Sequence, residues 1–531
     1  MAHLVDVTTA SGIPDPAAPW PDGLYRIHEI TTSGLALFDA DGDGDLDAFL
    51  VCHPPPGNPD APAPDRLFRN GPGMRFEEVP GAGGLADPGH GNGAAVGDVE
   101  NDGDLDVFVC NLGKDSLYRN AGDGSFADAT SRSGIDERGW SSGAAFLDFD
   151  RDGDLDLYVV HYVVDDPSRV CRPGRDEKRE YCGPSRYESV PDALYRNEGD
   201  ATFTDVSRAA GIVAPRAGLA VACLDLTADG WVDILVANDR QPNLLHVNRR
   251  DGTFVDEGLE RGVALSGGGD TEASMGIAPG DVNADGRLDL VVTALAGETA
   301  TLYLAAESGA YVDRSAPAGL GGSTLARTSW GTCFLDIEND GAVDLVLTNG
   351  RIARGPVPPG AKLEPFWNEY AETNQLFLND GKGLFRDAAT VGGSFTAEPG
   401  TWRALAMGDL DGDGDVDLAA ADLANRLRLF RNDAPRGHHW LRIRPLTGKR
   451  DALGALVAIE AGGRRQVRPI LGGSSYASSS EPVAHFGLGA AVAVSSVEVT
   501  WPDGKTERFA AAGVDRTLTV RQGEGRAVAS R

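Results

Sequence analysis

The chain alternates between short apolar runs and short acidic loops along most of its length. Small, glycine-containing apolar runs such as GLALF, GAAFL and GTCFL precede the acidic loops, and β-branched or aromatic runs such as DAFLV, DLYVV and DLVLT follow them. Short runs of this kind between turn signals are typical of buried strands. The pattern therefore predicts an all-β protein in which each acidic loop connects two strands.

The acidic loop recurs seven times as variants of Asp-x-Asp-x-Asp-Gly-x-x-Asp. The steps between successive copies are 59, 50, 77, 56, 55 and 73 residues, and the copies begin at Asp39, Asp98, Asp148, Asp225, Asp281, Asp336 and Asp409. Recurrence at roughly 50 residues indicates one supersecondary unit per repeat.

Two further strands are expected in most units. A segment such as LFRN, LYRN or LFLN precedes a turn, and an outer segment such as RFEEV, TFTDVS or LFRDAA follows it. Four strands in each of seven units predict a seven-bladed β-propeller. A solenoid is the rival architecture, but the sequence shows no capping repeats.

The seventh unit lacks its outer strand, because Pro435 stands where that strand should follow. The segment HLVDVT at residues 3–8 reads like an outer strand but precedes the first unit. We expect residues 3–8 to complete the last blade, which would close the ring and cover its edges. This assigns residues 1–435 to the propeller. We expect residues 436–525 to form a second, small β-domain, since Lys and Arg outnumber Asp and Glu by 14 to 8 from residue 436 onward.

The two long steps between loops mark insertions at residues 163–191 and 351–373. Long loops on a rigid ring more often carry recognition than structure. Cys171 and Cys182 lie in the first insertion, where the expectation is a disulfide and the alternative a pair of free thiols or half of a metal site. The other cysteines fall in or beside apolar strands and are expected to be buried thiols, namely Cys52, Cys110, Cys223 and Cys333.

Most of the negative net charge of this 531-residue chain comes from the acidic loops, so it says little about binding partners. The seven loops hold 30 acidic and two basic residues, and so account for −28 of the net charge of −32. No basic stripe suggests binding to nucleic-acid phosphates. The sequence has no stretch of 18 apolar residues, so no membrane span is predicted. The first residues show no secretory signal pattern. We expect a monomer.

The loop spacing predicts calcium sites. Positions 1, 3, 5 and 9 supply side-chain oxygens, position 7 a backbone carbonyl, and Gly at position 6 permits a sharp turn, which together suit the six to eight oxygen ligands of Ca²⁺ better than strictly octahedral Mg²⁺. An EF-hand is excluded because strands flank the loops and Leu50 and Val109 stand where its Glu would be. The alternative is a set of solvated acidic turns. Up to seven sites follow, with ligands at Asp39, Asp41, Asp43, Asp45, Asp47, Asp98, Glu100, Asp102, Asp104, Asp106, Asp148, Asp150, Asp152, Asp154, Asp156, Asp225, Thr227, Asp229, Trp231, Asp233, Asp281, Asn283, Asp285, Arg287, Asp289, Asp336, Glu338, Asp340, Ala342, Asp344, Asp409, Asp411, Asp413, Asp415 and Asp417.

The sites should differ in strength. The fourth loop has Thr227 at position 3 and only three carboxylates, so the weakest binding is expected there. Asn283 makes the third position of the fifth loop neutral as well.

No motif of a nucleotide-binding or hydrolytic enzyme is present. The central channel is nevertheless a natural site, because the first residues of the innermost strands converge on it, and these lie near Ser33, His90, Trp140, Arg216, Glu272, Trp330 and Arg403. We take Glu272, Arg403, Arg216 and His90 as catalytic candidates. The alternative is that these side chains plug the channel. In the C-terminal region, Arg464, Arg465 and Arg468 are expected on a solvated face, or alternatively docked against the acidic rim.

The loops and their flanking strands resemble FG-GAP/VCBS repeats, the calcium-binding blades of integrin-α-type propellers. The segment GKRDALGALVAIEAGGRRQVRPILGGSSYASSS at 448–480, with HFGLG at 485–489 and VEVTWPDGK at 497–505, resembles the ASPIC/UnbV domain. The combination is similar to the cartilage acidic protein family, as are YCGP at 181–184, AND at 237–239 and EASMG at 272–276. The resemblance implies a calcium-binding propeller with a small β-domain, usually extracellular and without a defined activity.

Two functions stay open. The first is a calcium-stabilised binding or adhesion module without catalysis, which meets a protein, glycan or small-molecule ligand through its rim loops. The second is an enzyme that acts on a small polar or anionic metabolite at the channel mouth. The resemblance implies an extracellular or periplasmic location, and the absence of a signal pattern leaves the cytoplasm as the alternative.

Overall fold

The computed structural model describes residues 4–14, 19–59, 61–136, 139–172, 178–435 and 437–528. The all-β prediction is confirmed, because short strands dominate these ranges and every helix is only three to five residues long. The helices are η1 (Ile27–Ile30), η2 (Pro80–Gly84), α1 (Thr130–Ser133), η3 (Pro184–Arg186), α2 (Ser207–Ala210), α3 (Gly258–Arg261), α4 (Gly321–Thr324), α5 (Pro365–Asn368) and α6 (Gly393–Ala397). No helix in the described ranges has the length and apolarity that crossing a membrane requires.

Six antiparallel sheets follow the chain order, each with its first strand innermost and its fourth outermost. The first sheet holds β2 (Gly34–Phe38), β3 (Asp47–Val51), β4 (Arg66–Arg69) and β5 (Glu77–Glu78), and the second β6 (Gly91–Gly97), β7 (Asp106–Asn111), β8 (Ser116–Asn120) and β9 (Phe126–Asp128). The third holds β10 (Ser141–Leu147), β11 (Asp156–His161), β12 (Ala193–Asn197) and β13 (Phe203–Asp205), and the fourth β14 (Gly218–Leu224), β15 (Asp233–Asn238), β16 (Leu244–Asn248) and β17 (Phe254–Asp256). The fifth holds β18 (Ile277–Gly280), β19 (Asp289–Val292), β20 (Thr301–Ala305) and β21 (Tyr311–Asp313), and the sixth β22 (Ser329–Leu335), β23 (Asp344–Asn349), β24 (Gln375–Asn379) and β25 (Phe385–Asp387).

The seventh sheet joins the two ends of the repeat region. It contains β26 (Trp402–Gly408), β27 (Asp417–Asp422) and β28 (Leu427–Asn432), and its outermost strand is β1 (Leu4–Asp6). β1 runs antiparallel to β28, with Leu4 opposite Asn432 and Asp6 opposite Phe430. This is the pairing expected for residues 3–8, of which residue 3 lies outside the described ranges.

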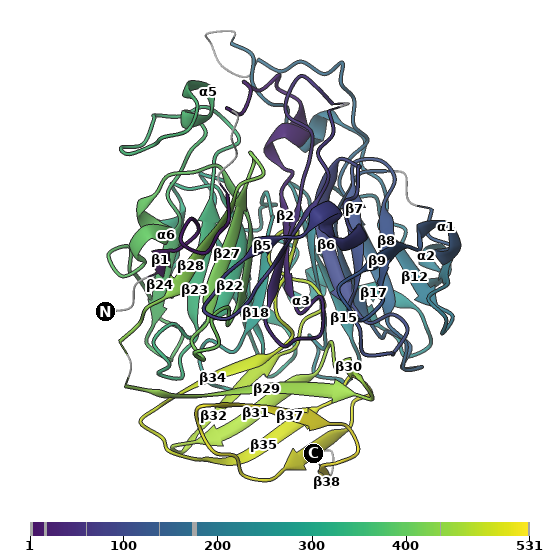
Figure 1. Cartoon of the computed structure of the whole chain (residues 1–531), viewed down its shortest axis with the longest axis vertical. Helices are drawn as coiled ribbons and strands as arrows, with labels where there is room; N and C mark the ends of the chain where they lie inside the picture. The colour runs from purple at the N-terminus through teal and green to yellow at the C-terminus, as the bar shows by residue number, and fades with distance from the viewer. Residues whose placement is uncertain are drawn as a thin grey trace.

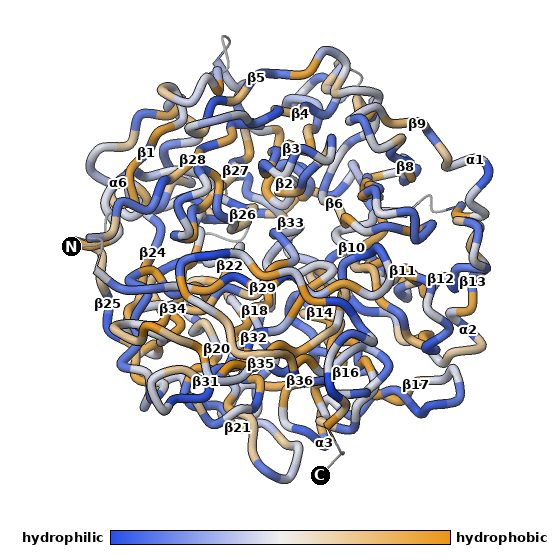
Figure 2. The backbone as a smooth tube through the Cα atoms, turned by 60° about the horizontal axis from the view of Figure 1, so that its bottom comes forward, coloured by the Kyte–Doolittle hydropathy of each residue, from blue (hydrophilic) through white to orange (hydrophobic). Residues whose placement is uncertain are grey.

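The seven sheets stand around a common centre (Figure 2). The innermost strand of each sheet lies against that of the next, and β26 lies against β2. Apolar side chains fill the space between neighbouring sheets, as Phe38, Phe49 and Val107 do between the first and second. We interpret this ring as the seven-bladed propeller that the repeats predict.

A second group of strands lies against one face of the ring and forms the lower part of Figure 1. One of its sheets contains β30 (Arg450–Asp451), β29 (His439–Thr447), β34 (Ala484–Gly489) and β37 (Arg516–Arg521), and the other β32 (Arg464–Pro469), β31 (Leu456–Ala461), β35 (Val494–Thr500), β36 (Thr506–Phe509) and β38 (Arg526–Val528). Buried Ile443, Ile459 and Trp501 belong to a core shared by the two sheets. We call residues 437–528 the C-terminal domain.

One short strand of the C-terminal domain leaves it. β33 (Ser478–Ser479) pairs in parallel with β2 and so belongs to the first sheet of the ring. Figure 2 places β33 near the centre of the ring, among the inner strands.

Candidate metal loops and central channel

Each acidic loop connects the first and second strands of its sheet, at the face of the ring that meets the C-terminal domain (Figure 1). The first carboxylate organises most of the loops by accepting backbone hydrogen bonds. Asp39, for example, accepts bonds from the amides of Gly42 at 2.8 Å and Gly44 at 3.0 Å. The predicted role of Gly at position 6 is confirmed, since φ lies between 86° and 102° at Gly44, Gly103, Gly153, Gly230, Gly286, Gly341 and Gly414.

Carboxylate oxygens converge in three of the loops. In each group one oxygen from every residue lies within 4.8 Å of the others, and the groups are Asp39, Asp41 and Asp43; Asp148, Asp150 and Asp156; and Asp409, Asp411 and Asp417. These are hard oxygen donors at the separations that a shared cation requires, so the first, third and seventh loops fit Ca²⁺. Within the described ranges the other four loops do not reach this convergence.

The carboxylate at position 9 has a structural task in every loop. Asp47 accepts hydrogen bonds from the amides of Ala40 at 3.0 Å and Asn70 at 2.7 Å, which tie its loop to the third strand. Burial raises the pKa of Asp47 to about 7. The same pair of backbone bonds recurs at Asp106, Asp156, Asp233, Asp289, Asp344 and Asp417.

Hydrogen bonds to the backbone carbonyl at the second position of each loop join every sheet to its neighbour. In six sheets an asparagine at the end of the third strand donates its side-chain amide to the carbonyl oxygen at that position in the preceding sheet. The donors are Asn70, Asn120, Asn197, Asn248, Asn379 and Asn432. The fifth sheet has Ala305 at this point, and there the hydroxyl of Tyr311 donates to the carbonyl of Leu226 at 3.0 Å. The asparagine at the end of LFRN, LYRN and LFLN was the sequence signal for these hydrogen bonds.

Arginines of the C-terminal domain contact two of the converging loops. Arg442 donates to Asp409 Oδ2 at 2.9 Å and also pairs with Glu481, while Arg450 lies 3.3 Å from Asp148 Oδ2 and is almost fully buried. Each arginine thus lies beside the first carboxylate of a predicted metal loop. These residues could orient that carboxylate for a bound cation.

The expectation that Arg464, Arg465 and Arg468 form a solvated face is wrong in part. Arg464 donates to the carbonyl oxygen of Asp340 in the sixth loop at 3.1 Å, which agrees with the docked alternative. Arg468 is half-buried; it donates a hydrogen bond to the carbonyl oxygen of His485 and packs over the Phe486 ring. Arg465 remains exposed, paired with Glu498. Arg464 and Arg465 are both exposed, so only part of this basic face is in contact with the acidic loops.

The structure places the catalytic candidates apart. Among the described residues no hydrogen bond or ion pair joins any two of Glu272, Arg403, Arg216 and His90. Arg403 is fully buried and donates to the carbonyl oxygens of Ile30, Gly350, Trp402 and Arg351. Its guanidinium also lies 4.1 Å from the Trp330 ring centre. Four of its five N–H donors are thus engaged by backbone carbonyls, and a guanidinium held in this way serves the packing of the channel.

The other candidates lie at the rim opposite the acidic loops. Burial raises the pKa of Glu272 to about 7, and the hydroxyl of Thr301 donates to its carboxylate at 2.7 Å. Burial, together with the neighbouring imidazoles, lowers the pKa of His90 to about 2, and its ring packs against those of His28 and His53. Arg216 is half-buried and donates to the carbonyl of Pro215.

The channel itself is filled by the chain. Ser33, Trp140 and Trp330 are all buried, as expected if they plug it. Tyr476 of the C-terminal domain is also fully buried there, with its ring centre 4.9 Å from that of Trp330. Sequence reasoning missed this contribution, because the segment around Tyr476 carries no strand pattern.

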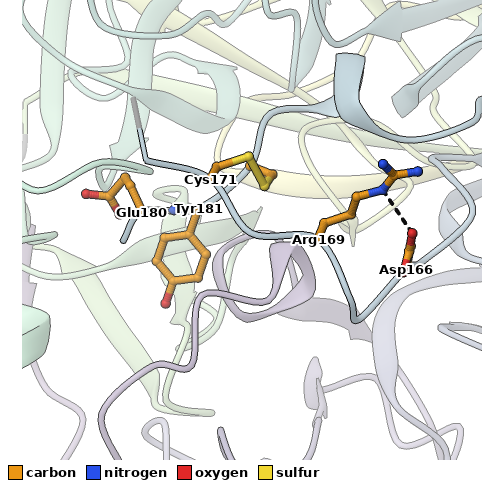
Figure 3. Close-up of a disulfide and its surroundings, with 6 residues drawn as sticks. Asp166, Arg169, Cys171, Glu180 and Tyr181 are labelled. Atoms are coloured by element: carbon orange, nitrogen blue, oxygen red, sulfur yellow. Dashed lines mark hydrogen bonds and ion pairs between the residues drawn. A yellow bond between two sulfur atoms is a disulfide. The ribbon is translucent and has the colours of Figure 1, made fainter. Parts of the chain in front are cut away.

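The predicted disulfide is confirmed, with Cys171 and Cys182 bonded across 11 residues (Figure 3). Next to it, Glu180 accepts the hydroxyl of Tyr370 at 2.7 Å and a bond from Arg354 at 3.1 Å. Both donors belong to the insertion at 351–373, so Glu180, two residues from Cys182, joins the two insertions. The predicted buried thiols are confirmed at Cys52, Cys110, Cys223 and Cys333.

Comparisons with known proteins agree with the repeat pattern. A family model described as FG-GAP-like repeat matches residues 39–109, 98–159, 225–292, 281–347 and 363–420, more than half of the chain. A second family model, ASPIC and UnbV, matches residues 446–527. Cartilage acidic protein 1 of Homo sapiens is 32% identical over 328 residues, which are 60% of this chain and 46% of that protein, and the protein of Mus musculus is 31% identical. The chain thus covers less than half the length of these relatives.

Solved structures show weaker similarity. A lectin of Agrocybe aegerita that recognises non-reducing terminal N-acetylglucosamine is 15% identical, with 74% of this chain and 85% of that chain covered and a TM-score of 0.40. The surface component PorZ of Porphyromonas gingivalis is 12% identical, with 95% and 61% covered and a TM-score of 0.44. The assignment rests on the sequence matches: the chain belongs to the FG-GAP-like repeat proteins that carry an ASPIC and UnbV domain, and it is related to cartilage acidic protein 1.

Proposed function

We propose that this protein is a calcium-stabilised binding module that acts outside the cytoplasm. The observation that carries the calcium part is the convergence of carboxylate oxygens within 4.8 Å in three loops. Such clusters of like charge destabilise the folded protein unless a cation neutralises them. Calcium would therefore act as a structural ion at the face between the ring and the C-terminal domain.

The binding part of the proposal assigns recognition to the opposite face. There the insertions at 163–191 and 351–373 contact each other through Glu180, Tyr370 and Arg354. A cavity of about 500 Å³ opens between the second insertion and the seventh sheet, which is within the range of small-ligand sites. Its charged lining residues are Asp6, Lys362, Glu398, Asp422, Arg426 and Arg428. A lining of both signs suits a polar ligand such as a glycan or a charged segment of a protein.

The disulfide supports the proposed location, since such bonds persist in oxidising compartments and are rare in the cytoplasm. The acidity of the chain gives no support to nucleic-acid binding. The enzyme alternative receives no support at the channel, because each nitrogen of the Arg403 guanidinium donates to a backbone carbonyl and Tyr476 fills the space beside Trp330.

The experiment that tests the calcium part is isothermal titration of metal-free protein with Ca²⁺ and, separately, Mg²⁺. We expect at least three Ca²⁺ ions per chain, and weaker binding of Mg²⁺ because it demands stricter octahedral geometry. Replacing residues 351–373 with a short Gly-Ser linker tests the binding part on a glycan and protein array. Loss of array binding with unchanged Ca²⁺ stoichiometry supports the recognition face, whereas unchanged array binding refutes it.

A further inference from the structure

The segment from Gly472 to Glu481 links β32 to β34 but does not stay within the C-terminal domain. It runs into the centre of the ring, where β33 pairs with β2 through Leu35 opposite Ser478 and Ala36 opposite Ser479. β33 also lies against the inner strands β6 and β26. We call residues 472–481 the hub segment.

The hub segment forms hydrogen bonds with the inner strands of five sheets. The bonds join Leu35 N to Ala477 O, Ser479 Oγ to Ala94 O, Ile277 N to Ser475 O, Thr332 N to Ser475 Oγ, Leu405 N to Ser478 Oγ and Met407 N to Ser480 Oγ, at 3.0–3.3 Å. The innermost strand of a sheet has no neighbour on its inner edge, so its amides there need another acceptor. Serine hydroxyls and backbone carbonyls of the hub segment supply these acceptors.

Small residues let the hub segment approach the remaining sheets. A side chain at Gly472 would meet the carbonyl oxygen of Phe146 at 2.4 Å, and one at Gly473 would meet that of Ala144 at 2.8 Å, both in the third sheet. Ser474 lines a small cavity together with Ala220 and Val221 of the fourth sheet. The hub segment therefore bonds to five sheets, lies close against the third and faces the fourth across this cavity.

Tyr476 extends the segment toward the far end of the channel. Its hydroxyl donates to the carbonyl oxygen of Thr31 at 2.5 Å, just before β2 begins. Two ion pairs hold the domain on the ring, between Arg442 and Asp409 and between Arg450 and Asp148. The insertion of the segment and the docking of the domain thus occur at one continuous interface.

We propose that the channel is an intramolecular binding site for an extended, serine-rich peptide, occupied by the hub segment of the same chain. The C-terminal domain then forms the centre of the ring, and undocking of this domain and opening of the ring are one cooperative transition. This goes beyond the proposed function, because it does not depend on calcium or on the recognition face. It also assigns the ASPIC and UnbV sequence GGSSYASSS the role of joining the inner strands of the ring.

The test uses the full chain with Ser475→Ala, Ser478→Ala and Ser480→Ala combined. The substitutions remove four side-chain hydrogen bonds, three to the inner strands and one from Ser478 to the carbonyl of Tyr476, and should lower the melting temperature by roughly 3–5 °C for a chain of this size. Hydrogen exchange should quicken at Thr332, Leu405 and Met407, which lie in two sheets far from the substitutions in sequence. The control combines Ser125→Ala, Ser168→Ala and Ser495→Ala at exposed serines and should leave both measurements unchanged. A melting temperature equal to that of the control would refute the role of the serines.

The wild-type protein provides a second test that does not depend on the variant folding. Hydrogen exchange is followed in increasing denaturant, with calcium present. Amides of β31 and β35 in the C-terminal domain and of β2, β22 and β26 in the ring should lose protection at the same denaturant concentration. Loss of protection in the C-terminal domain while the inner strands of the ring stay protected would overturn the proposal.

Discussion

The side-chain amide of Asn70 donates a hydrogen bond of 2.8 Å to the backbone carbonyl oxygen of Leu410, 340 residues further along the chain. Both groups are buried, and the bond joins the first sheet to the seventh. The same contact recurs between each pair of neighbouring sheets, with Tyr311 in place of asparagine in the fifth. The bond at Asn70 therefore connects the two ends of the repeat region independently of β1.

Asn70→Ala should destabilise the protein by about 1–3 kcal/mol, because the buried carbonyl of Leu410 then lacks its donor. The free energy of unfolding from urea titration in saturating Ca²⁺ measures this effect. Tyr311→Phe removes only a hydroxyl and should lower the free energy of unfolding by a similar amount. Asn58→Ala, at an exposed asparagine, is the control and should change it by less than about 0.5 kcal/mol. Equal stability of Asn70→Ala and Asn58→Ala would contradict the structural role of the bond.

Calcium removal should lower the melting temperature. At a free concentration 100-fold above Kd each bound ion adds about 2.7 kcal/mol, so three occupied loops correspond to a loss of roughly 7–10 °C on chelation. Differential scanning calorimetry with EDTA, and with EDTA followed by excess Ca²⁺, measures the loss and its reversal. An unchanged melting temperature in EDTA would show that the acidic loops hold no structural metal.

The loops should contribute unequally. Asp39→Asn removes a carboxylate from a converging loop, whereas Asp225→Asn alters the fourth loop, which has only three carboxylates. We expect Asp39→Asn to cause the larger drop in melting temperature in Ca²⁺, and the difference between the two variants to vanish in EDTA. A difference that persists in EDTA would point to the backbone bonds of Asp39 instead of a metal.

Local features of this structure were predictable, and long-range features were not. The apolar runs and acidic loops gave the strands, and the missing outer strand of the last unit pointed to β1. The spacing of Cys171 and Cys182 in a charged loop pointed to the disulfide. These inferences need only residues that are near one another in sequence or repeated in register.

The hub segment could not be placed from its sequence. GGSSYASSS has neither strand periodicity nor a charge pattern, and its partners Leu35, Ile277 and Leu405 lie in three different sheets. Arg403 was taken as a catalytic candidate because the sequence does not show whether a buried arginine donates to backbone carbonyls or to a ligand. Only the three-dimensional arrangement shows which of these acceptors lie within reach.

The disulfide should stabilise the contact between the two insertions. Closing an 11-residue separation corresponds to about 2–3 kcal/mol of local stability. In the double variant Cys171→Ser and Cys182→Ser, the positions of Glu180 and Tyr181 are less constrained, so limited proteolysis within 163–191 should quicken severalfold. Wild-type protein in reductant should match the variant, and oxidised wild-type protein should resist. Equal cleavage in all three would show that the contacts of Glu180 alone hold the loop.

Lowering the pH should reduce the free energy of unfolding through His485, which lies where the C-terminal domain contacts the seventh loop. Burial, with the nearby Arg442 and Arg468, lowers the pKa of His485 from 6.5 to about 3. Below pH 6.5 the unfolded chain takes up a proton at this imidazole that the folded chain does not, so stability falls as the pH falls from 6.5 toward 3. The loss reaches up to about 2 kcal/mol at pH 5. His485→Gln should reduce the slope of the free energy of unfolding against pH between 7 and 5 by the share of one imidazole, measured in saturating Ca²⁺, while buried His90 keeps its own share. Asn58→Ala, at an exposed residue that does not titrate, is the control and should keep the wild-type slope. A slope in His485→Gln equal to that of the control would mean that the proton uptake occurs at other groups.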